Sequence, residues 1–133
     1  MTNPSRPEKE FGIEKYIIRL KDLVAYSPPG HSKTRNYRLL GPGLGGSDRL
    51  KVILGQIEYG GQADPHLHPD LEEAFFVLEG KAAVEIAGET EVVGPDDFIY
   101  LPPGTPHRVT PLEGPPLRIL IIYSPPLLSS GKG

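Results

Sequence analysis

The chain has 133 residues, the size of one domain, and 14 basic and 17 acidic side chains give it a net charge of −3. Without a basic stripe, it is not expected to bind nucleic acid. The absence of cysteine excludes disulfides, thiolate metal sites and a cysteine nucleophile, and fits a cytoplasmic location. No apolar run is long enough to span a bilayer, and Met1–Glu10 lacks the apolar core of a signal peptide, so no membrane partner is expected.

The 16 glycines and 16 prolines divide the chain with turns, which favours many short strands over helices. We expect a flexible arm over residues 1–14, a single barrel domain over 15–123 with its motif core at 50–123, and a flexible tail over 124–133.

The first part of this domain is the least regular. Lys15–Val24 is predicted as a strand, although periodicity alone leaves a short helix open, and Thr34–Leu40 is predicted as a second, short strand. His31 follows a Pro-Pro-Gly break. It is either a loop histidine or part of an arm that folds over the mouth of a barrel.

From residue 50 onward, short segments rich in Val, Ile, Leu, Phe and Tyr alternate with turns built from Gly, Pro and Asp. Turns at this spacing are typical of an all-β sandwich or barrel. The predicted strands are Leu50–Tyr59, Glu73–Leu78, Lys81–Ile86, Glu91–Val93, Phe98–Leu101, His107–Thr110 and Leu117–Tyr123.

Three of the 4 histidines fall in two short stretches, and the first of these also holds acidic side chains. His66 and His68 are two residues apart, so in an extended chain they point to the same side. Glu73 opens the next predicted strand, and His107 follows a Pro-Gly-Thr-Pro turn. Three imidazoles and a carboxylate suffice to hold a divalent metal ion and leave positions open for a substrate.

The neighbours of these residues leave some alternatives. Glu72 competes with Glu73 as a ligand, and we favour Glu73, whose face would carry Phe75 and Val77 as an apolar wall. Other polar side chains are either pocket groups or ordinary strand surface, because their faces depend on register. They are Gln56, Tyr59, Tyr100 and Arg118.

These stretches resemble the two signature motifs of the cupin superfamily. The first, G-x5-H-x-H-x3–4-E-x6-G, is matched in every term by Gly60, His66, His68, Glu73 and Gly80. The second, G-x5-P-x-G-x2-H-x3-N, is matched by Pro102, Gly104 and His107, whereas Asp96 replaces its first glycine and Pro111 its asparagine. These departures fall on turn positions, and Asp tolerates a positive φ better than most residues.

The resemblance covers about residues 50–123 and implies a double-stranded β-helix, or jelly roll, with a site inside the barrel. It implies that His66, His68, Glu73 and His107 bind one divalent metal ion per subunit: Fe(II) first, with Mn, Ni, Zn or Cu as alternatives. In similar proteins an N-terminal strand completes the sheet of a neighbouring subunit. Tyr16–Val24 is the segment that would do so here, and a homodimer is expected.

Membership of such a superfamily does not fix the chemistry. The first hypothesis is a metal-dependent enzyme, dioxygenase-like, acting on a small chelating organic substrate. With a redox-inert metal the same site would serve a Lewis-acid isomerase or lyase. The alternatives are a non-catalytic barrel that binds a small molecule and a structural barrel without metal.

Overall fold

The structure is a computed structural model, described here for residues 12–43, 47–63 and 69–126. Within these ranges it is an all-β protein of eight strands, as the sequence predicts. The strands are β1 (His31–Leu40), β2 (Lys51–Ala63), β3 (Glu72–Glu79), β4 (Ala82–Ile86), β5 (Glu89–Val93), β6 (Phe98–Leu101), β7 (His107–Pro111) and β8 (Leu117–Ser124). The predicted bounds of β6 are those observed, and the others from residue 50 onward differ by a few residues.

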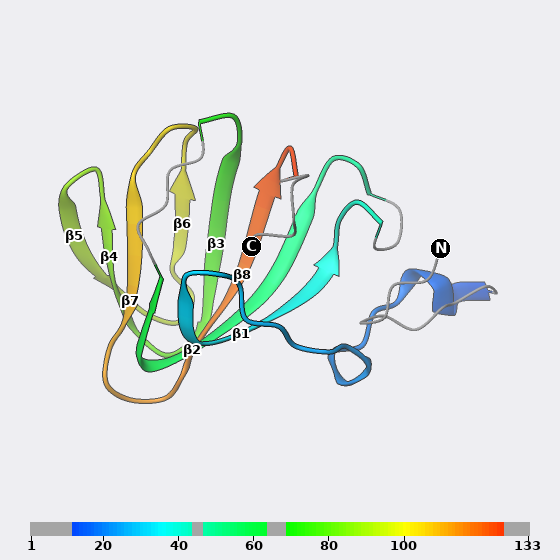
Figure 1. Cartoon of the computed structure of the whole chain (residues 1–133), viewed down its shortest axis with the longest axis horizontal. Helices are drawn as coiled ribbons and strands as arrows, with labels where there is room; N and C mark the ends of the chain where they lie inside the picture. The colour runs from blue at the N-terminus through cyan, green and yellow to red at the C-terminus, as the bar shows by residue number, and fades with distance from the viewer. Residues whose placement is uncertain (1–11, 44–46, 64–68, 127–133) are drawn as a thin grey trace.

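The strands form two antiparallel sheets, one with the order β1-β2-β8-β3-β6 and one with the order β5-β4-β7 (Figure 1). Strand β2 is 13 residues long and contacts β7 of the smaller sheet as well as its hydrogen-bonded neighbours β1 and β8. It therefore closes one side of the jelly roll, while the β3–β4 turn joins the sheets elsewhere. The arrangement confirms the predicted cupin-type jelly roll.

Period-two alternation decides which side chains enter the space between the sheets. Phe75 of β3 is almost fully buried, and Val77 of β3, Ile53 of β2 and Leu117 of β8 are completely so. Each such side chain contributes about 1.5–3 kcal/mol to folding. Because Phe75 and Val77 alternate with more exposed residues, Glu73 shares their inward face, as the sequence predicts.

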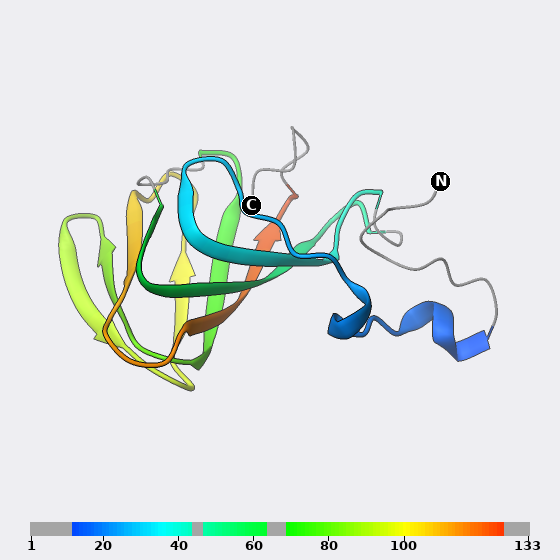
Figure 2. The same ribbon diagram turned by 60° about the horizontal axis from the view of Figure 1, so that its bottom comes forward.

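The segment before β1 corrects the prediction of a strand at Lys15–Val24. It holds two short 3-10 helices, Gly12–Tyr16 and Leu20–Asp22, and lies to one side of the sheets in both views (Figures 1 and 2). The first turn is stabilised locally, because Arg19 forms an ion pair with Glu14 at 2.6 Å. No strand among the described residues pairs with this segment, so the local turn prevails, which is the helical alternative left open above.

The other expectations for the chain ends stay predictions, because residues 1–11 and 127–133 lie outside the described ranges. The strands span residues 31–124 and lie almost wholly inside the predicted domain. Among the helices that the structure describes, none is long and apolar enough to cross a membrane.

Gly80, in the turn between β3 and β4, has a backbone φ of +83° and almost no space for a side chain. An added Cβ would lie 2.7 Å from the carbonyl oxygen of Pro116. Gly88, in the turn between β4 and β5, has a similar φ of +88° but nothing within 4 Å of such a Cβ. A side chain at Gly88 would therefore cost backbone strain alone, whereas a side chain at Gly80 would cost the same strain and also collide with the backbone.

We expect Gly88→Ala to lower the free energy of unfolding by about 1–2 kcal/mol, the cost of a left-handed alanine. Gly80→Ala adds a clash with the backbone and should lose at least about 2–4 kcal/mol, in the range of other strained or overpacked sites. Urea unfolding of both variants measures the difference. Equal losses would contradict the close approach of Pro116.

Candidate metal centre

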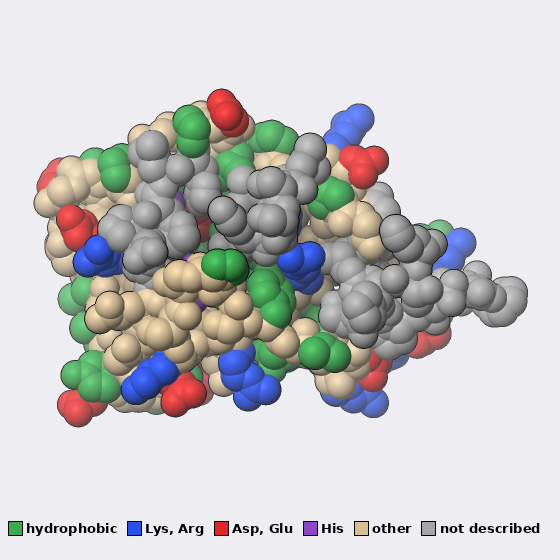
Figure 3. All heavy atoms as spheres, viewed as in Figure 1, with side chains coloured by type: hydrophobic (Ala, Val, Ile, Leu, Met, Phe, Trp, Pro, Cys, Tyr) green, Lys and Arg blue, Asp and Glu red, His purple; other side chains and the backbone are tan. Residues whose placement is uncertain are grey.

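Two of the four predicted ligands meet between the sheets. Glu73 begins the inward face of β3, His107 is the first residue of β7, and Glu73 Oε1 lies 3.3 Å from His107 Nε2. Both residues are buried, with 8% and 7% of their surface exposed. On the face drawn in Figure 3, histidine atoms are visible only in small patches.

The other two predicted ligands, His66 and His68, fall in residues 64–68, outside the described part of the chain. Among the residues that are described, no group of three or more His, Cys, Asp or Glu side chains could hold a metal. The assignment of the four residues as metal ligands therefore stays a prediction, with Glu73 and His107 placed together.

Local hydrogen bonds position His107. The loop before it turns at Pro102, whose carbonyl accepts a hydrogen bond from Thr105 N at 3.2 Å. The carbonyl oxygen of Pro106 accepts a hydrogen bond from Ala87 N at 3.0 Å, which links this loop to the β4–β5 turn. The imidazole is then held by its own loop, since His107 Nδ1 lies 3.0 Å from the carbonyl oxygen of Thr105.

This last contact fixes the tautomer of His107. A carbonyl oxygen only accepts hydrogen bonds, so Nδ1 carries the hydrogen and Nε2 faces Glu73. A lone pair on Nε2 would repel the Glu73 carboxylate unless a proton or a cation lies between them. Burial lowers the pKa of His107, but the hydrogen bonds to Glu73 and Thr105 and the charge of Glu73 raise it by more, so the net shift is upward.

The chemistry of these donors fits a divalent metal ion. A histidine that binds a metal usually donates its other ring N–H to a backbone carbonyl or a carboxylate, as His107 Nδ1 does toward Thr105. The carboxylate oxygen and the imidazole nitrogen converge from two sheets, so one ion can bind both. Without cysteine, the site offers nitrogen and oxygen donors alone, which suit Fe(II), Mn, Ni, Zn or Cu.

The structure separates Glu73 from the competing carboxylate. Glu72 is exposed on the opposite face of β3, where its carboxylate accepts a hydrogen bond from the Tyr100 hydroxyl. Gln56 and Arg118, partners across β2 and β8, alternate with buried residues and so also face away from the interior. Tyr59 is exposed as well. Gln56 and Arg118 thus do not share the inward face of Glu73, and Tyr59 is open to solvent.

His31 starts β1 opposite Ala63, the last residue of β2. It is partly exposed and belongs to a strand, so it is not a loop histidine, while an arm folded over the mouth of the barrel stays a prediction.

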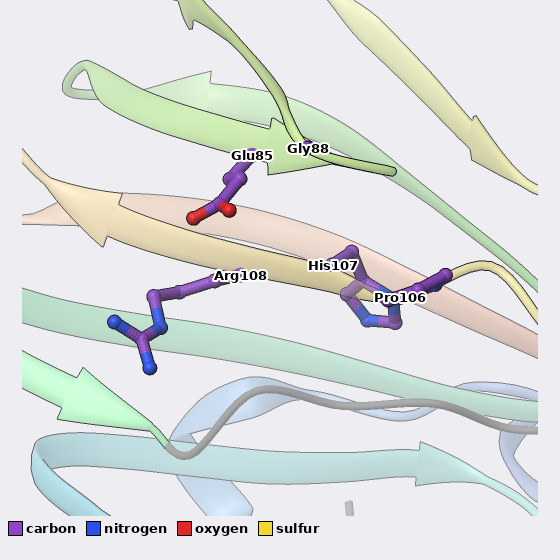
Figure 4. A pocket seen from close by; sticks show the side chains of 5 residues that line it. All are labelled: Glu85, Gly88, Pro106, His107 and Arg108. Carbon is purple, nitrogen blue, oxygen red and sulfur yellow. The ribbon is translucent and has the colours of Figure 1, made fainter.

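A shallow surface pocket touches His107 from the smaller sheet. Glu85 of β4 and Arg108 of β7 are cross-strand partners that lie together at one end of it, and Pro106 and His107 lie at the other (Figure 4). Glu85 and Arg108 are exposed and alternate with inward residues, so this pocket opens to solvent. It is separate from the contact between His107 and Glu73.

Sequence reasoning missed polar residues that share the interior with Glu73. Tyr123 of β8 is paired in register with Glu73 on one side and with Lys51 of β2 on the other. Burial, and then the charges of Glu73 and Tyr26, raise the pKa of Tyr123 well above its usual value, so its phenol stays protonated. Alternation from Ile53 and Ile121 would have placed Lys51 and Tyr123 inward, but only the register shows that they adjoin Glu73.

Comparison with known proteins decides the family. The model of the family described as "Cupin domain" matches residues 53–123. This chain belongs to the cupin family. The match spans the strands that carry Glu73 and His107, as well as residues 66 and 68.

Among curated relatives of this cupin is the uncharacterised protein MJ1618 of Methanocaldococcus jannaschii, 38% identical over 61 residues, which are 46% of this chain and 49% of that protein. The uncharacterised protein YdbB of Bacillus subtilis is 41% identical over 61 residues, 45% of this chain and 49% of that protein. The matched region thus spans about half the length of these relatives.

Solved structures of other proteins resemble the cupin over most of both chains. One is the polyketide cyclase RemF from Streptomyces resistomycificus, 26% identical, with a TM-score of 0.73 and 87% of each chain covered. KdgF from Halomonas sp. is 21% identical, with a TM-score of 0.67 over 81% of this chain and 91% of that one. At this identity the similarity supports a shared fold and no shared activity.

Removal of either placed ligand should release the metal. We expect wild-type protein, purified without a metal-binding tag or chelator, to carry a divalent metal. Glu73→Gln and His107→Ala should bind the metal at least about 100-fold more weakly, because replacing residues that only hydrogen-bond to the ligands already lowers metal affinity about 10- to 100-fold. Elemental mass spectrometry measures the content. Glu72→Gln, a neighbouring carboxylate on the outer face, should retain the metal. Full metal in Glu73→Gln and His107→Ala would show that the ion binds elsewhere.

Proposed function

We propose that this cupin is a metal-dependent enzyme that acts on a small chelating organic substrate. The observation that carries the proposal is the buried contact of Glu73 with His107, whose imidazole is oriented by the Thr105 carbonyl. Glu73 and His107 would hold the ion, with His66 and His68 as the remaining predicted ligands. When bound, such an ion supplies Lewis acidity toward an enol or enolate, and iron adds reactivity toward O₂.

The other inward residues prepare the site for that substrate. Tyr123 keeps its proton, so its hydroxyl can donate a hydrogen bond to a negatively charged oxygen of the substrate. Phe75 and Leu101, buried beside Glu73 in β3 and β6, keep water from the floor of the site. In a drier interior each hydrogen bond and charge interaction with the substrate is stronger.

Dioxygenase-like oxidation with Fe(II) is the first candidate reaction, because a donor set of imidazole and carboxylate suits non-haem iron. A redox-neutral reaction, such as a cyclisation, isomerisation or elimination, is the second. It is favoured by the similarity to the polyketide cyclase RemF, which at 26% identity covers 87% of both chains.

The homodimer remains part of this proposal. The outer face of the larger sheet is apolar across neighbouring strands, with Leu120 of β8, Phe76 of β3 and Phe98 of β6 in one row of register. Phe98 is 62% exposed, and such a surface supports contact with a second subunit.

The test uses acetylacetone and succinylacetone, two enolisable β-diketones, with protein loaded separately with Fe(II) and with Zn. Ultraviolet absorbance follows the loss of the enolate, and an oxygen electrode follows O₂. Oxygen uptake by the Fe(II)-loaded protein but not by the Zn-loaded protein would identify the oxidation. Conversion of the diketone under nitrogen, with either metal, would identify the redox-neutral reaction.

We expect Glu73→Gln to reduce turnover at least about 100-fold. Glu72→Gln is the matched control and should keep wild-type activity. Saturable binding of both diketones without conversion under any of these conditions would contradict an enzyme and favour the alternative of a non-catalytic binding barrel.

A further inference from the structure

Lys51 lies in the same row of the sheet as Glu73. The register pairs Lys51 with Tyr123 and Tyr123 with Glu73, so the three residues follow one another across β2, β8 and β3. These three strands are neighbours in the larger sheet (Figure 1). Strands in a sheet are 4.7–4.9 Å apart, which puts the Lys51 and Glu73 backbones about 10 Å from each other. With Lys51 and Tyr123 each 3% exposed, all three belong to the interior.

The Lys51 side chain is turned along this row. Its Nζ lies 5.9 Å from the centroid of the Tyr123 ring, within the range of a cation–π contact. Ile53, two residues further along β2, is completely buried on the same face. The ammonium group therefore lies beside the Tyr123 ring, on the inward face of the sheet and not on its outer surface.

A second cation comes from β1. Arg38 is paired in register with Ile53, so it projects from the same face of the sheet as Lys51. Burial, and then the charge of Arg38, lower the pKa of Lys51 to about 8, so the two positive charges are close enough to act on each other. Like charges in a partly buried setting repel, and an anion bound between them would relieve that repulsion.

Tyr26 completes the cluster. Its backbone exchanges hydrogen bonds of 2.9 and 2.7 Å with that of Asn36 on β1, and the Arg38 guanidinium carbon lies 5.0 Å from the centroid of its ring. The Tyr26 hydroxyl oxygen is buried and has no hydrogen-bond partner among the described residues. It also acts electrostatically on Tyr123. A hydroxyl donor is thus aimed at the same interior region as the two cations.

We propose that Lys51, Arg38 and Tyr26 form a subsite that binds a carboxylate of the substrate, next to the metal centre. A guanidinium binds a carboxylate through paired hydrogen bonds, an ammonium adds a compact charge, and the phenol adds a third donor. The substrate is then an acid that chelates at one end and is held by its carboxylate at the other. This role for the subsite rests on the function proposed above.

The first experiment compares two ligands that differ only in charge. Zn-loaded protein is titrated in a calorimeter with succinylacetone, a β-diketone with a carboxylate, and with the methyl ester of succinylacetone. We expect succinylacetone to bind at least tenfold more tightly. In Lys51→Met and in Arg38→Gln this preference should vanish while the affinity for the ester stays unchanged.

Matched controls are Lys81→Met and Arg35→Gln, which remove exposed cations from the same protein and should keep the preference. Circular dichroism verifies that each variant is folded, and Tyr26→Phe should reduce the preference in part. Equal affinity of the wild-type protein for acid and ester would overturn the subsite. So would a preference that survives in both Lys51→Met and Arg38→Gln.

A second experiment separates the subsite from the proposed function. In metal-free protein, glutarate should raise the melting temperature of the wild type and of Lys81→Met, but not of Lys51→Met or Arg38→Gln. If the ester fails to bind Zn-loaded protein while glutarate still stabilises the metal-free wild type, the chelating enzyme is contradicted and the subsite stands. Absence of stabilisation by glutarate overturns the subsite.

Discussion

The approach of Glu73 to His107 is the constraint on which the rest of the molecule depends. The two side chains come from strands of different sheets, yet they converge inside the protein at 3.3 Å. A buried carboxylate is unfavourable unless it is paired with a proton or a cation, so this contact must be compensated in every state of the protein. The carbonyl of Thr105 orients the His107 imidazole, and the alternation along β3 turns Glu73 inward.

The interior is divided along the strands into a polar and an apolar layer. One row across the larger sheet carries Lys51, Tyr123 and Glu73, and ends at Leu101. The next inward row is apolar from β2 to β6, with Ile53, Ile121, Phe75 and Ile99, and its member on the edge strand β1 is Arg38. The apolar row packs as a floor and lowers the dielectric constant around the polar row, so the charges above it interact more strongly. Binding chemistry and core packing thus occupy adjacent layers of one sheet.

Much of this could be predicted from the sequence, because local rules govern it. Alternation and glycine-rich turns located the strands from residue 50 onward, and alternation from Phe75 and Val77 placed Glu73 inward and Glu72 outward. Asp96, where the family motif has glycine, has a φ of +74°, the left-handed conformation that aspartate was expected to tolerate.

Other features depend on contacts that no local pattern records. The prediction of a strand at Lys15–Val24 was wrong, because its apolar spacing fits a turn equally well and no strand in the described part of the chain pairs with it. Lys51, Arg38 and Tyr26 come from separate segments, and only the register of β1, β2 and β8 brings them together. The placement of His66 and His68 lies outside the described residues, so that part of the site stays a prediction.

The most direct test of the metal centre is a crystal structure of the Zn-loaded protein, with anomalous scattering recorded at the zinc edge. The account predicts one strong anomalous peak about 2.0–2.2 Å from both Glu73 Oε1 and His107 Nε2, with His107 Nδ1 still hydrogen-bonded to the Thr105 carbonyl. An anomalous peak elsewhere, with Glu73 and His107 still in direct contact, would contradict it.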